Sequence, residues 1–203
     1  MPKTKKKFKI LAASDVHGDQ ATIKKLAEKA KKEDVDLVVL AGDLTGFVES
    51  KNILKPFVDK GEKVVFVPGN WDTAEAAEVL AKMYKVKDIG KHYVKYEDVG
   101  IFGIGSADWQ LDLDDHKTFK KLEKDFNKIK DLEKKIMVSH LHAAKTKAEF
   151  TGIPGSEELR KAIEKFQPDL FIAGHIHEAE GLSEKIGKTK VIAAGRKGKI
   201  IEI

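Results

Sequence analysis

The chain has 203 residues, 41% of them hydrophobic, with a net charge of +5 and no cysteine. This length suits one hydrophobic core, so we expect a single domain over residues 1–203. The absence of cysteine excludes disulfides, thiol nucleophiles and Cys-ligated zinc.

No apolar run reaches the roughly 18 residues of a membrane span. The Lys-rich start is followed by an apolar run too short for a signal-peptide core, so we expect a cytoplasmic protein. Lys alternates with Glu and Asp in segments such as 117–135, which favours a mixed-charge surface over a nucleic-acid patch. Among 38 basic residues only Arg160 and Arg196 are arginine, and this Lys/Glu bias is typical of hyperthermophile proteins.

Short apolar runs alternate with longer charged segments along the chain. Apolar residues at helical spacing, such as Ile23, Leu26 and Ala30, indicate helices between the runs. The runs are nearly continuous, as expected of strands with both faces covered by other layers. The pattern predicts an α/β protein with buried strands at 8–14, 36–43, 63–70, 135–140 and 169–175.

The remaining segments predict a second or mixed sheet and one further helix. Ser156 followed by two Glu residues is a good helix start, and Pro168 ends that helix. We interpret 142–156 as an ordered loop at the edge of the site. Further strands joined by tight turns are expected at 91–98, 100–105, 185–194 and 198–203.

Each of the five apolar runs ends in residue types that bind metals. In open α/β sheets the carboxyl ends of the strands face one crevice, where ligands bind. The residues concerned are Asp15, His17, Asp43, Asn70, His140, His142, His175 and His177.

Each of these residues alone has a simpler interpretation. A lone Asp after a strand is usually a turn former or a helix cap, and Asn70 could cap a helix that starts near Thr73. Their joint occurrence favours a metal site, because five of the seven histidines fall at strand ends. For the other two, His92 and His116, we expect a surface position.

The ordered set Asp-x-His, Gly-Asp, Gly-Asn, His and Gly-His-x-His resembles the calcineurin-like metallophosphoesterases. The phrases "PDLFIAGHIHEAEG" and "KIGKT" are similar to the small stand-alone prokaryotic branch of that family. The resemblance implies a four-layer α/β/β/α sandwich of two mixed sheets, with a dinuclear metal centre at the strand ends. It implies that Asp15, His17 and His177 hold one metal, that Asn70, His140 and His175 hold the other, and that Asp43 bridges both.

Carboxylate, imidazole and amide ligands suit Mn²⁺, our first expectation, and also Fe, Co²⁺, Ni²⁺ or Zn²⁺. Two such ions about 3.5 to 4 Å apart can activate a water and clamp a phosphate ester. We therefore expect hydrolysis of phosphate esters by a metal-activated hydroxide, with Asp43 and Asn70 in the catalytic centre. His142 lies two residues after His140 and points to the same side of an extended segment, so we expect it near the substrate.

Two positions depart from the family pattern. The family commonly has a His directly after the motif Asn, where it helps protonate the leaving group, and here that residue is Trp71. The indole N–H is no acid at neutral pH, so Trp71 is expected either to form a pocket wall or to pack under its loop. Arg196 lies in "VIAAGRKG", where relatives often have Asn-Pro-Gly, and could face phosphate or be an exposed hairpin residue.

These observations favour a phosphodiesterase, because dianionic monoesters most need the proton donor that Trp71 replaces. Two alternatives remain. One is a metal-site scaffold or interaction module without useful turnover. The other is a nuclease, suggested by the positive net charge.

Overall fold

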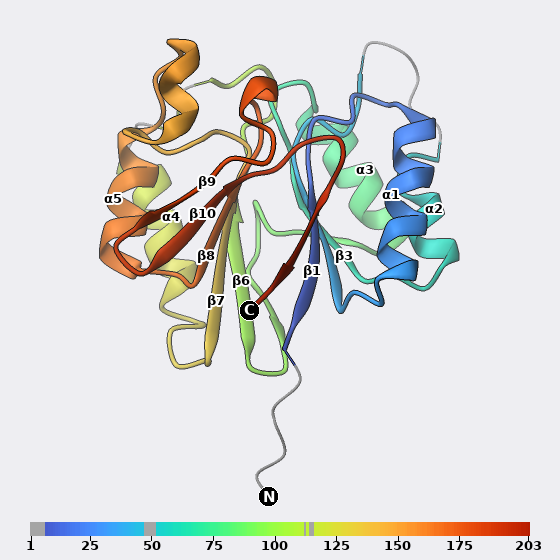
Figure 1. The fold of residues 1–203 in the computed structure, drawn as a ribbon, viewed down its shortest axis with the longest axis horizontal. Coiled ribbons are helices and arrows are strands. Elements are labelled where there is room, and N and C mark those ends of the chain that lie inside the picture. The colour runs from blue at the N-terminus through green and yellow to red at the C-terminus, as the bar shows by residue number, and fades with distance from the viewer. Residues whose placement is uncertain (1–6, 47–51, 112, 114–115) are drawn as a thin grey trace, which may run out of the picture.

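The computed structural model describes residues 7–46, 52–111, 113 and 116–203 (Figure 1). The first of its two sheets contains both parallel and antiparallel strand pairs. The strand order is β11-β1-β2-β3-β4. β11 pairs antiparallel with β1, whereas the pairs β1–β2, β2–β3 and β3–β4 are parallel. The strands are β1 (Lys9–Ala13), β2 (Leu37–Ala41), β3 (Val64–Val67), β4 (Lys87–Asp88) and β11 (Lys199–Glu202).

The second sheet is also mixed, in the order β5-β6-β7-β8-β10-β9. Its central pairs are parallel, and β5–β6 and β9–β10 are antiparallel. The strands are β5 (Val94–Tyr96), β6 (Val99–Ile104), β7 (Lys134–Ser139), β8 (Leu170–Ala173), β9 (Ser183–Ile186) and β10 (Thr189–Ala193).

Helices cover the outer face of each sheet, with one group on each side of the strands in Figure 1. The first sheet is covered by α1 (Gln20–Lys32), α2 (Lys55–Asp59) and α3 (Ala74–Tyr84). The second is covered by α4 (His116–Phe126) and α5 (Glu157–Phe166). Two short 3₁₀ helices, η1 (Lys147–Thr151) and η2 (His177–Ala179), follow β7 and β8.

Three hydrophobic cores lie between the four layers. Val38 faces the helices beside the first sheet, whereas its neighbour Val39 faces the core between the sheets. In the second sheet, Ile172 faces the core between the sheets and Phe171 faces α4 and α5. Successive strand residues point to opposite faces, so both faces of these strands must be apolar. The structure confirms the predicted four-layer α/β/β/α sandwich.

Local signals explain where the helices begin. The side chains of Asp19, Thr73 and Ser156 accept hydrogen bonds from the first turns of α1, α3 and α5, as N-caps do. The predicted start of α5 at Ser156 is confirmed. The segment 142–156 contains η1, so it is more regular than the loop that we expected.

Among the described residues, no helix is long and apolar enough to span a lipid bilayer.

Candidate metal centre

The predicted ligands all follow strands whose carboxyl ends lie at one edge of the sandwich. Asp15 and His17 follow β1, Asp43 follows β2, and Asn70 follows β3. In the second sheet, His140 and His142 follow β7, and His175 and His177 follow β8. Parallel strands bring their carboxyl ends together, so two sheets packed face to face concentrate these side chains in one place.

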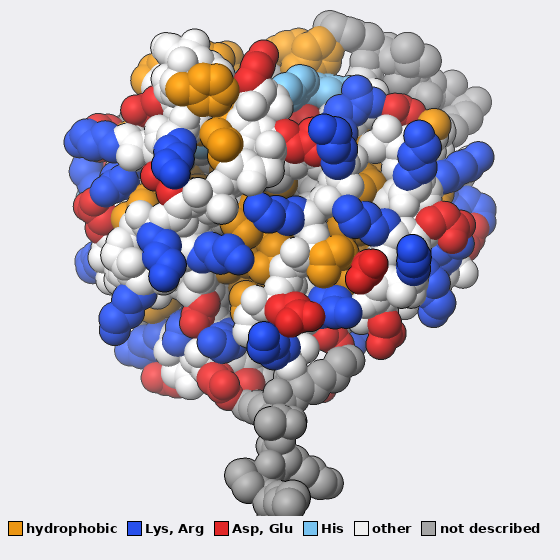
Figure 2. Space-filling model, viewed as in Figure 1, with side chains coloured by type: hydrophobic (Ala, Val, Ile, Leu, Met, Phe, Trp, Pro, Cys, Tyr) orange, Lys and Arg blue, Asp and Glu red, His pale blue; other side chains and the backbone are white. Residues whose placement is uncertain are grey.

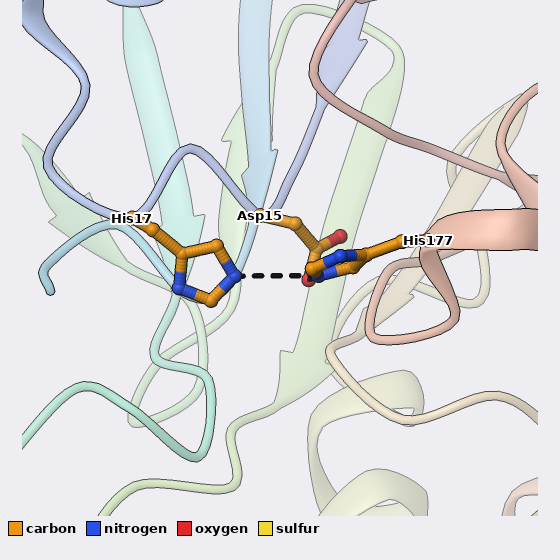
Figure 3. Close-up of side chains that lie close together, drawn as sticks. All are labelled: Asp15, His17 and His177. Atoms are coloured by element: carbon orange, nitrogen blue, oxygen red, sulfur yellow. Dashed lines mark hydrogen bonds and ion pairs between the residues drawn. The ribbon is translucent and has the colours of Figure 1, made fainter.

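Asp15, His17 and His177 form the first cluster. The Nε2 atoms of His17 and His177 lie 3.3 Å apart, and Nε2 of His177 is 3.6 Å from Oδ1 of Asp15. Figure 3 shows the two imidazoles reaching toward the Asp15 carboxylate from opposite sides. All three ligand atoms lie within 4.8 Å of one another, as ligands of one ion would. The structure thus brings together the set that the resemblance assigned to one metal.

Asp43, Asn70 and His140 lie together beside this cluster. Nε2 of His140 is 2.9 Å from Oδ1 of Asn70 and 3.4 Å from Oδ2 of Asp43. Its other ring nitrogen, Nδ1, is 2.9 Å from the carbonyl oxygen of Ala41. A carbonyl can only accept, so Nδ1 carries the hydrogen and Nε2 is directed at the site, as is usual for metal-binding histidines.

Asp43 lies between the two clusters. Its Oδ2 is 3.4 Å from Nε2 of His140 and 3.8 Å from Nε2 of His17, so it approaches one predicted ligand of each metal. Its Oδ1 accepts a hydrogen bond of 2.9 Å from the backbone N–H of Trp71, which fixes the carboxylate. This position is compatible with the bridging role that the resemblance implies for Asp43, although Asp15 is the residue common to the two groups of convergent ligand atoms.

His175 is placed differently from the other six predicted ligands. Among the described His, Asp and Glu residues, the groups with ligand atoms within 4.8 Å are Asp15–His17–His177 and Asp15–Asp43–His140, and His175 is in neither. Its ring centroid is 5.2 Å from that of His140, and its backbone N–H donates to the Asp15 carboxylate. Burial and the neighbouring His140 lower the pKa of His175 to about 4, so this imidazole is neutral and able to bind a metal.

The backbone of the ligand loops is held in unusual conformations. Asp15, His17, Asp43 and His175 have φ between 45° and 69°, the left-handed region. Such residues cost roughly 1 kcal/mol or more each and cluster at functional sites. The loops also approach closely, because a Cβ on Gly69 would overlap Oδ1 of Asp43. Glycine is therefore required before Asn70.

Neighbouring charges set the protonation of the centre. Burial alone would lower the pKa of His140, but its hydrogen bond to Asp43 and the Asp43 charge raise it above the ordinary value. Burial alone would raise the pKa of Asp15, yet hydrogen bonds and the charges of nearby histidines lower it. The hydrogen bond to Asp15 raises the pKa of His177, and burial lowers that of His17. The Asp15 carboxylate is thus ionised and ready to bind a cation.

Asp72 ties two ligand loops together. Its carboxylate accepts hydrogen bonds from the backbone N–H groups of Leu44, Thr45 and Gly69 at 2.8 to 3.2 Å. Thr73, and neither Asp72 nor Asn70, provides the side-chain cap of α3. The loop after β2 and the loop after β3 are therefore fixed relative to each other.

Trp71 lies beside the first cluster and contacts a second tryptophan that the sequence did not single out. Its ring is 5.3 Å from that of His17 and 4.9 Å from that of Trp109. The backbone N–H of Trp109 donates to the carbonyl of Asn70 at 2.9 Å, which attaches the loop after β6 to the site. The sequence signal that could have identified Trp109 is its position shortly after the Gly-Ser pair at the end of β6, in a loop that begins at a strand end.

His142 is buried, with 4% of its surface exposed, and belongs to neither ligand group. Its Nε2 is 3.3 Å from the carbonyl oxygen of Ile153, so Nε2 carries the hydrogen, whereas the buried Nδ1 has no partner within the described structure. Burial lowers the pKa of His142, which keeps the ring neutral. The structure thus places His142 next to the centre without placing it among the ligands.

The other singled-out residues lie at the surface. Arg196 donates to Oδ2 of Asp19 at 2.5 Å, and both side chains are partly exposed. This contact favours the hairpin interpretation of Arg196 over the phosphate-facing one. His92 and His116 are exposed, which confirms the surface position expected for them.

The donor set fits divalent metals, because it combines two buried carboxylates, an amide oxygen and imidazoles whose nitrogens converge. The fold and the site therefore define a metal-binding α/β/β/α protein.

The sequence profile of the calcineurin-like phosphoesterases matches residues 8–179. The chain belongs to the calcineurin-like phosphoesterase family, as the motifs indicated. It is thus a metal-dependent hydrolase of phosphate esters, and the family implies binding of two divalent metal ions.

Solved structures with the same fold come from several kinds of organism. The protein TT1561 of Thermus thermophilus has a TM-score of 0.74 and 18% identity, over 97% of this chain and 99% of that chain. A purple acid phosphatase, PPD1 from yellow lupin seeds, has a TM-score of 0.65 and 15% identity, over 98% of this chain and 45% of that chain. An archaeal phosphodiesterase has a TM-score of 0.56 and 18% identity, over 96% of this chain and 99% of that chain. At these identities the likeness concerns the fold. A search of curated protein sequences found no match.

Proposed function

We propose that the protein hydrolyses phosphodiesters in preference to phosphomonoesters. Bound divalent ions would supply Lewis acidity and a nucleophilic water at neutral pH. Mn²⁺ is the metal that we propose first, with Fe, Co²⁺, Ni²⁺ or Zn²⁺ as alternatives suited to the same N and O donors. The proposed ligands are Asp15, His17, Asp43, Asn70, His140, His175 and His177, with Asp43 between the two ions.

The observation that carries the preference for diesters is Trp71 at the position after Asn70. Its indole ring lies 5.3 Å from the ring of His17 and offers no acidic proton. A dianionic monoester that loses an alkoxide needs protonation of the leaving group, whereas a diester with an acidic phenol needs it much less. The archaeal phosphodiesterase that shares the fold is compatible with this preference.

We propose that His142 contacts the substrate and contributes to catalysis without binding metal. Because its Nε2–H donates to the carbonyl of Ile153, the ring offers a lone pair at Nδ1 and no free proton. In this tautomer it can orient a hydrogen-bond donor but cannot replace the missing acid. His142 therefore does not restore activity on monoesters.

The test is a metal-by-substrate assay on metal-stripped and reconstituted protein. We expect metal-stimulated hydrolysis of bis(p-nitrophenyl) phosphate and a lower kcat/KM for p-nitrophenyl phosphate. Protein without added metal is the control. If no metal stimulates hydrolysis of any activated diester, the proposal is wrong, and a higher kcat/KM for the monoester would reject the diester preference alone.

The nuclease alternative makes a different prediction about charge. Figure 2 shows Lys and Arg side chains interspersed with Asp and Glu over the visible face, and many Lys residues are paired, such as Lys60 with Glu28. A nuclease would bind DNA or RNA with a steep dependence on salt. A weak, salt-insensitive response to both nucleic acids would favour a small phosphodiester.

A further inference from the structure

A cavity of about 430 Å³ lies beside the metal centre, on the side of the second sheet. Its volume falls within the roughly 300 to 1,000 Å³ of small-molecule sites. Its walls are mainly aliphatic and come from four separate stretches of chain. The aliphatic residues are Leu111, Leu113, Leu141, Ile153 and Pro154.

Two histidines connect the cavity to the centre. His175 lines it and also donates its backbone N–H to Asp15, one of the predicted ligands. His142 lines it as well, and its Nε2 hydrogen is already used by the Ile153 carbonyl. A group bound in the cavity would therefore lie beside the predicted metal centre.

The wall that contains Ile153 is fixed by hydrogen bonds. The backbone N–H of Gly155 donates to Oε1 of Glu149 at 2.9 Å, and that of Ser156 donates to the carbonyl of His142 at 2.9 Å. The backbone N–H of Ala144 in turn donates to the carbonyl of Ser156. This wall is thus part of the ordered fold.

The lining is suited to an uncharged group. None of the described residues that line the cavity is Lys, Arg, Asp or Glu. The hydroxyl of Ser156 accepts the N–H of Leu159 as the cap of α5. A charged group would lose water here without gaining an ion-pair partner among these residues, which is unfavourable. An apolar group would gain from burial against the aliphatic walls.

We propose that this cavity binds the apolar, uncharged organic group of the phosphate ester, so that esters of alkyl or aryl alcohols are preferred to those with charged organic groups. The inference rests on the proposed hydrolysis of phosphate esters and specifies its substrate class. Trp71, which we expected as a possible pocket wall, is not among the residues that line this cavity.

The test uses phosphonates, whose single organic group is attached by a P–C bond that a phosphoesterase leaves intact. Binding of phenylphosphonate, methylphosphonate and 2-carboxyethylphosphonate to the metal-reconstituted protein is measured by calorimetry. We expect phenylphosphonate to bind at least about tenfold more tightly than either of the others, which is 1.4 kcal/mol. Equal affinities for phenyl and methyl would overturn the proposal.

The variant Ile153→Lys places a charge at the rim of the cavity, where the side chain is 45% exposed and the substitution leaves the core intact. Its matched control is Val79→Lys, another β-branched residue, 53% exposed on α3. We expect Ile153→Lys to reduce the phenyl-to-methyl ratio to about one and Val79→Lys to leave it unchanged. If Ile153→Lys does not fold, Ile153→Gln replaces it. An unchanged ratio in the Ile153 variant would overturn the proposal.

These measurements also separate this inference from the proposed function. If esters are hydrolysed but phenylphosphonate has no advantage, the cavity proposal fails alone. If the advantage depends on Ile153 while no ester is hydrolysed with any metal, the proposed function fails alone.

Discussion

The two flanks of the metal centre differ in chemistry although the ligands between them come from equivalent strand ends. On the flank beside His17, Trp71 contacts Trp109, which is 59% exposed. On the opposite flank, the 4% exposed His142 borders an aliphatic cavity. The strand ends position the ligands, and the loops form the flanks. We therefore attribute the reaction to the ligands and the substrate selectivity to the flanks.

The flanks also differ in how their loops are held. Asp108 and Trp109 have φ near 60°, an unfavourable conformation for Trp, and backbone hydrogen bonds to Asp72 and Asn70 hold them there. The cavity wall has Gly152 in the left-handed position at the end of η1, where glycine costs little. The strained flank faces solvent at Trp109, so its conformation is not explained by burial of the indole ring.

The largest expected effect comes from the residue between the flanks. Asp43→Ala should lower activity by at least about 10³-fold and reduce metal content, because the carboxylate approaches His17 on one side and His140 on the other. Metal analysis and kcat/KM measure both effects. The control is Asp59→Ala, which removes an exposed carboxylate paired with Lys55. Full metal content with normal turnover in Asp43→Ala would contradict the bridging position.

The tryptophan flank should respond to a proton donor. Trp71→His should accelerate cleavage of poor leaving groups, by up to about 10²–10⁴-fold, and change activated phenyl esters much less. Trp71→Ala should instead raise KM for aromatic diesters, since an aromatic face is lost. Trp109→Ala is the control for loss of the ring pair. Equal slowing of good and poor leaving groups by Trp71→His would show that Trp71 is a packing residue.

The opposite flank should respond to loss of an imidazole. His142→Ala should leave metal content unchanged and lower kcat by about tenfold or more, because His142 lies outside both ligand groups and beside the cavity. Phenylphosphonate binding distinguishes a substrate contact from a change in the metals. Wild-type turnover with an unchanged pH profile would reduce His142 to a structural residue.

The sequence predicts the centre better than its flanks. Ligands such as Asp43 and Asn70 directly follow apolar runs, so a local pattern locates them and parallel pairing brings them together. The walls of the cavity have no such pattern. Leu113 and Ile153 are distant in sequence. They line the same cavity because they follow β6 and β7, which are neighbours in the sheet.

Short elements also escaped sequence analysis for physical reasons. β4 has two residues and α2 has five, too few for a periodic pattern. From the sequence, Asp72 could either order its loop or cap α3. The structure shows that it orders the loop. The sequence could not show this, because its partners Leu44 and Thr45 belong to another strand end.

The pH dependence of metal binding should follow His140. Asp43 raises the pKa of His140 in the metal-free protein, which favours the protonated ring. A metal that binds His140 must displace the proton from this ring. A raised pKa stabilises the metal-free fold below the unfolded pKa near 6.5, and this stability is lost as pH rises through the folded pKa. The difference in Tm between metal-loaded and metal-stripped protein should therefore grow from pH 6 to pH 8. A constant difference would show that no ligand proton is displaced in this range.

The smallest expected effect belongs to Arg196, which lies on neither flank. Its ion pair with Asp19 joins partly exposed side chains, and such pairs contribute roughly 0–1 kcal/mol. Asp19 also caps α1 through the N–H groups of Ala21 and Thr22. The pKa of Asp19 is lowered first by its hydrogen bond from the Thr22 hydroxyl, so the cap stays ionised without Arg196.

Arg196→Ala should therefore lower Tm by less than about 4 °C and leave KM for diesters unchanged, whereas Asp19→Ala should lower stability by roughly a further 1 kcal/mol through loss of the cap. Thermal unfolding and steady-state kinetics on the two variants separate these contributions. An increase in KM of tenfold or more in Arg196→Ala would mean that the guanidinium leaves Asp19 to face the phosphate. The centre would then have a third, cationic flank, and the contrast between an aromatic and an aliphatic side would no longer account for selectivity.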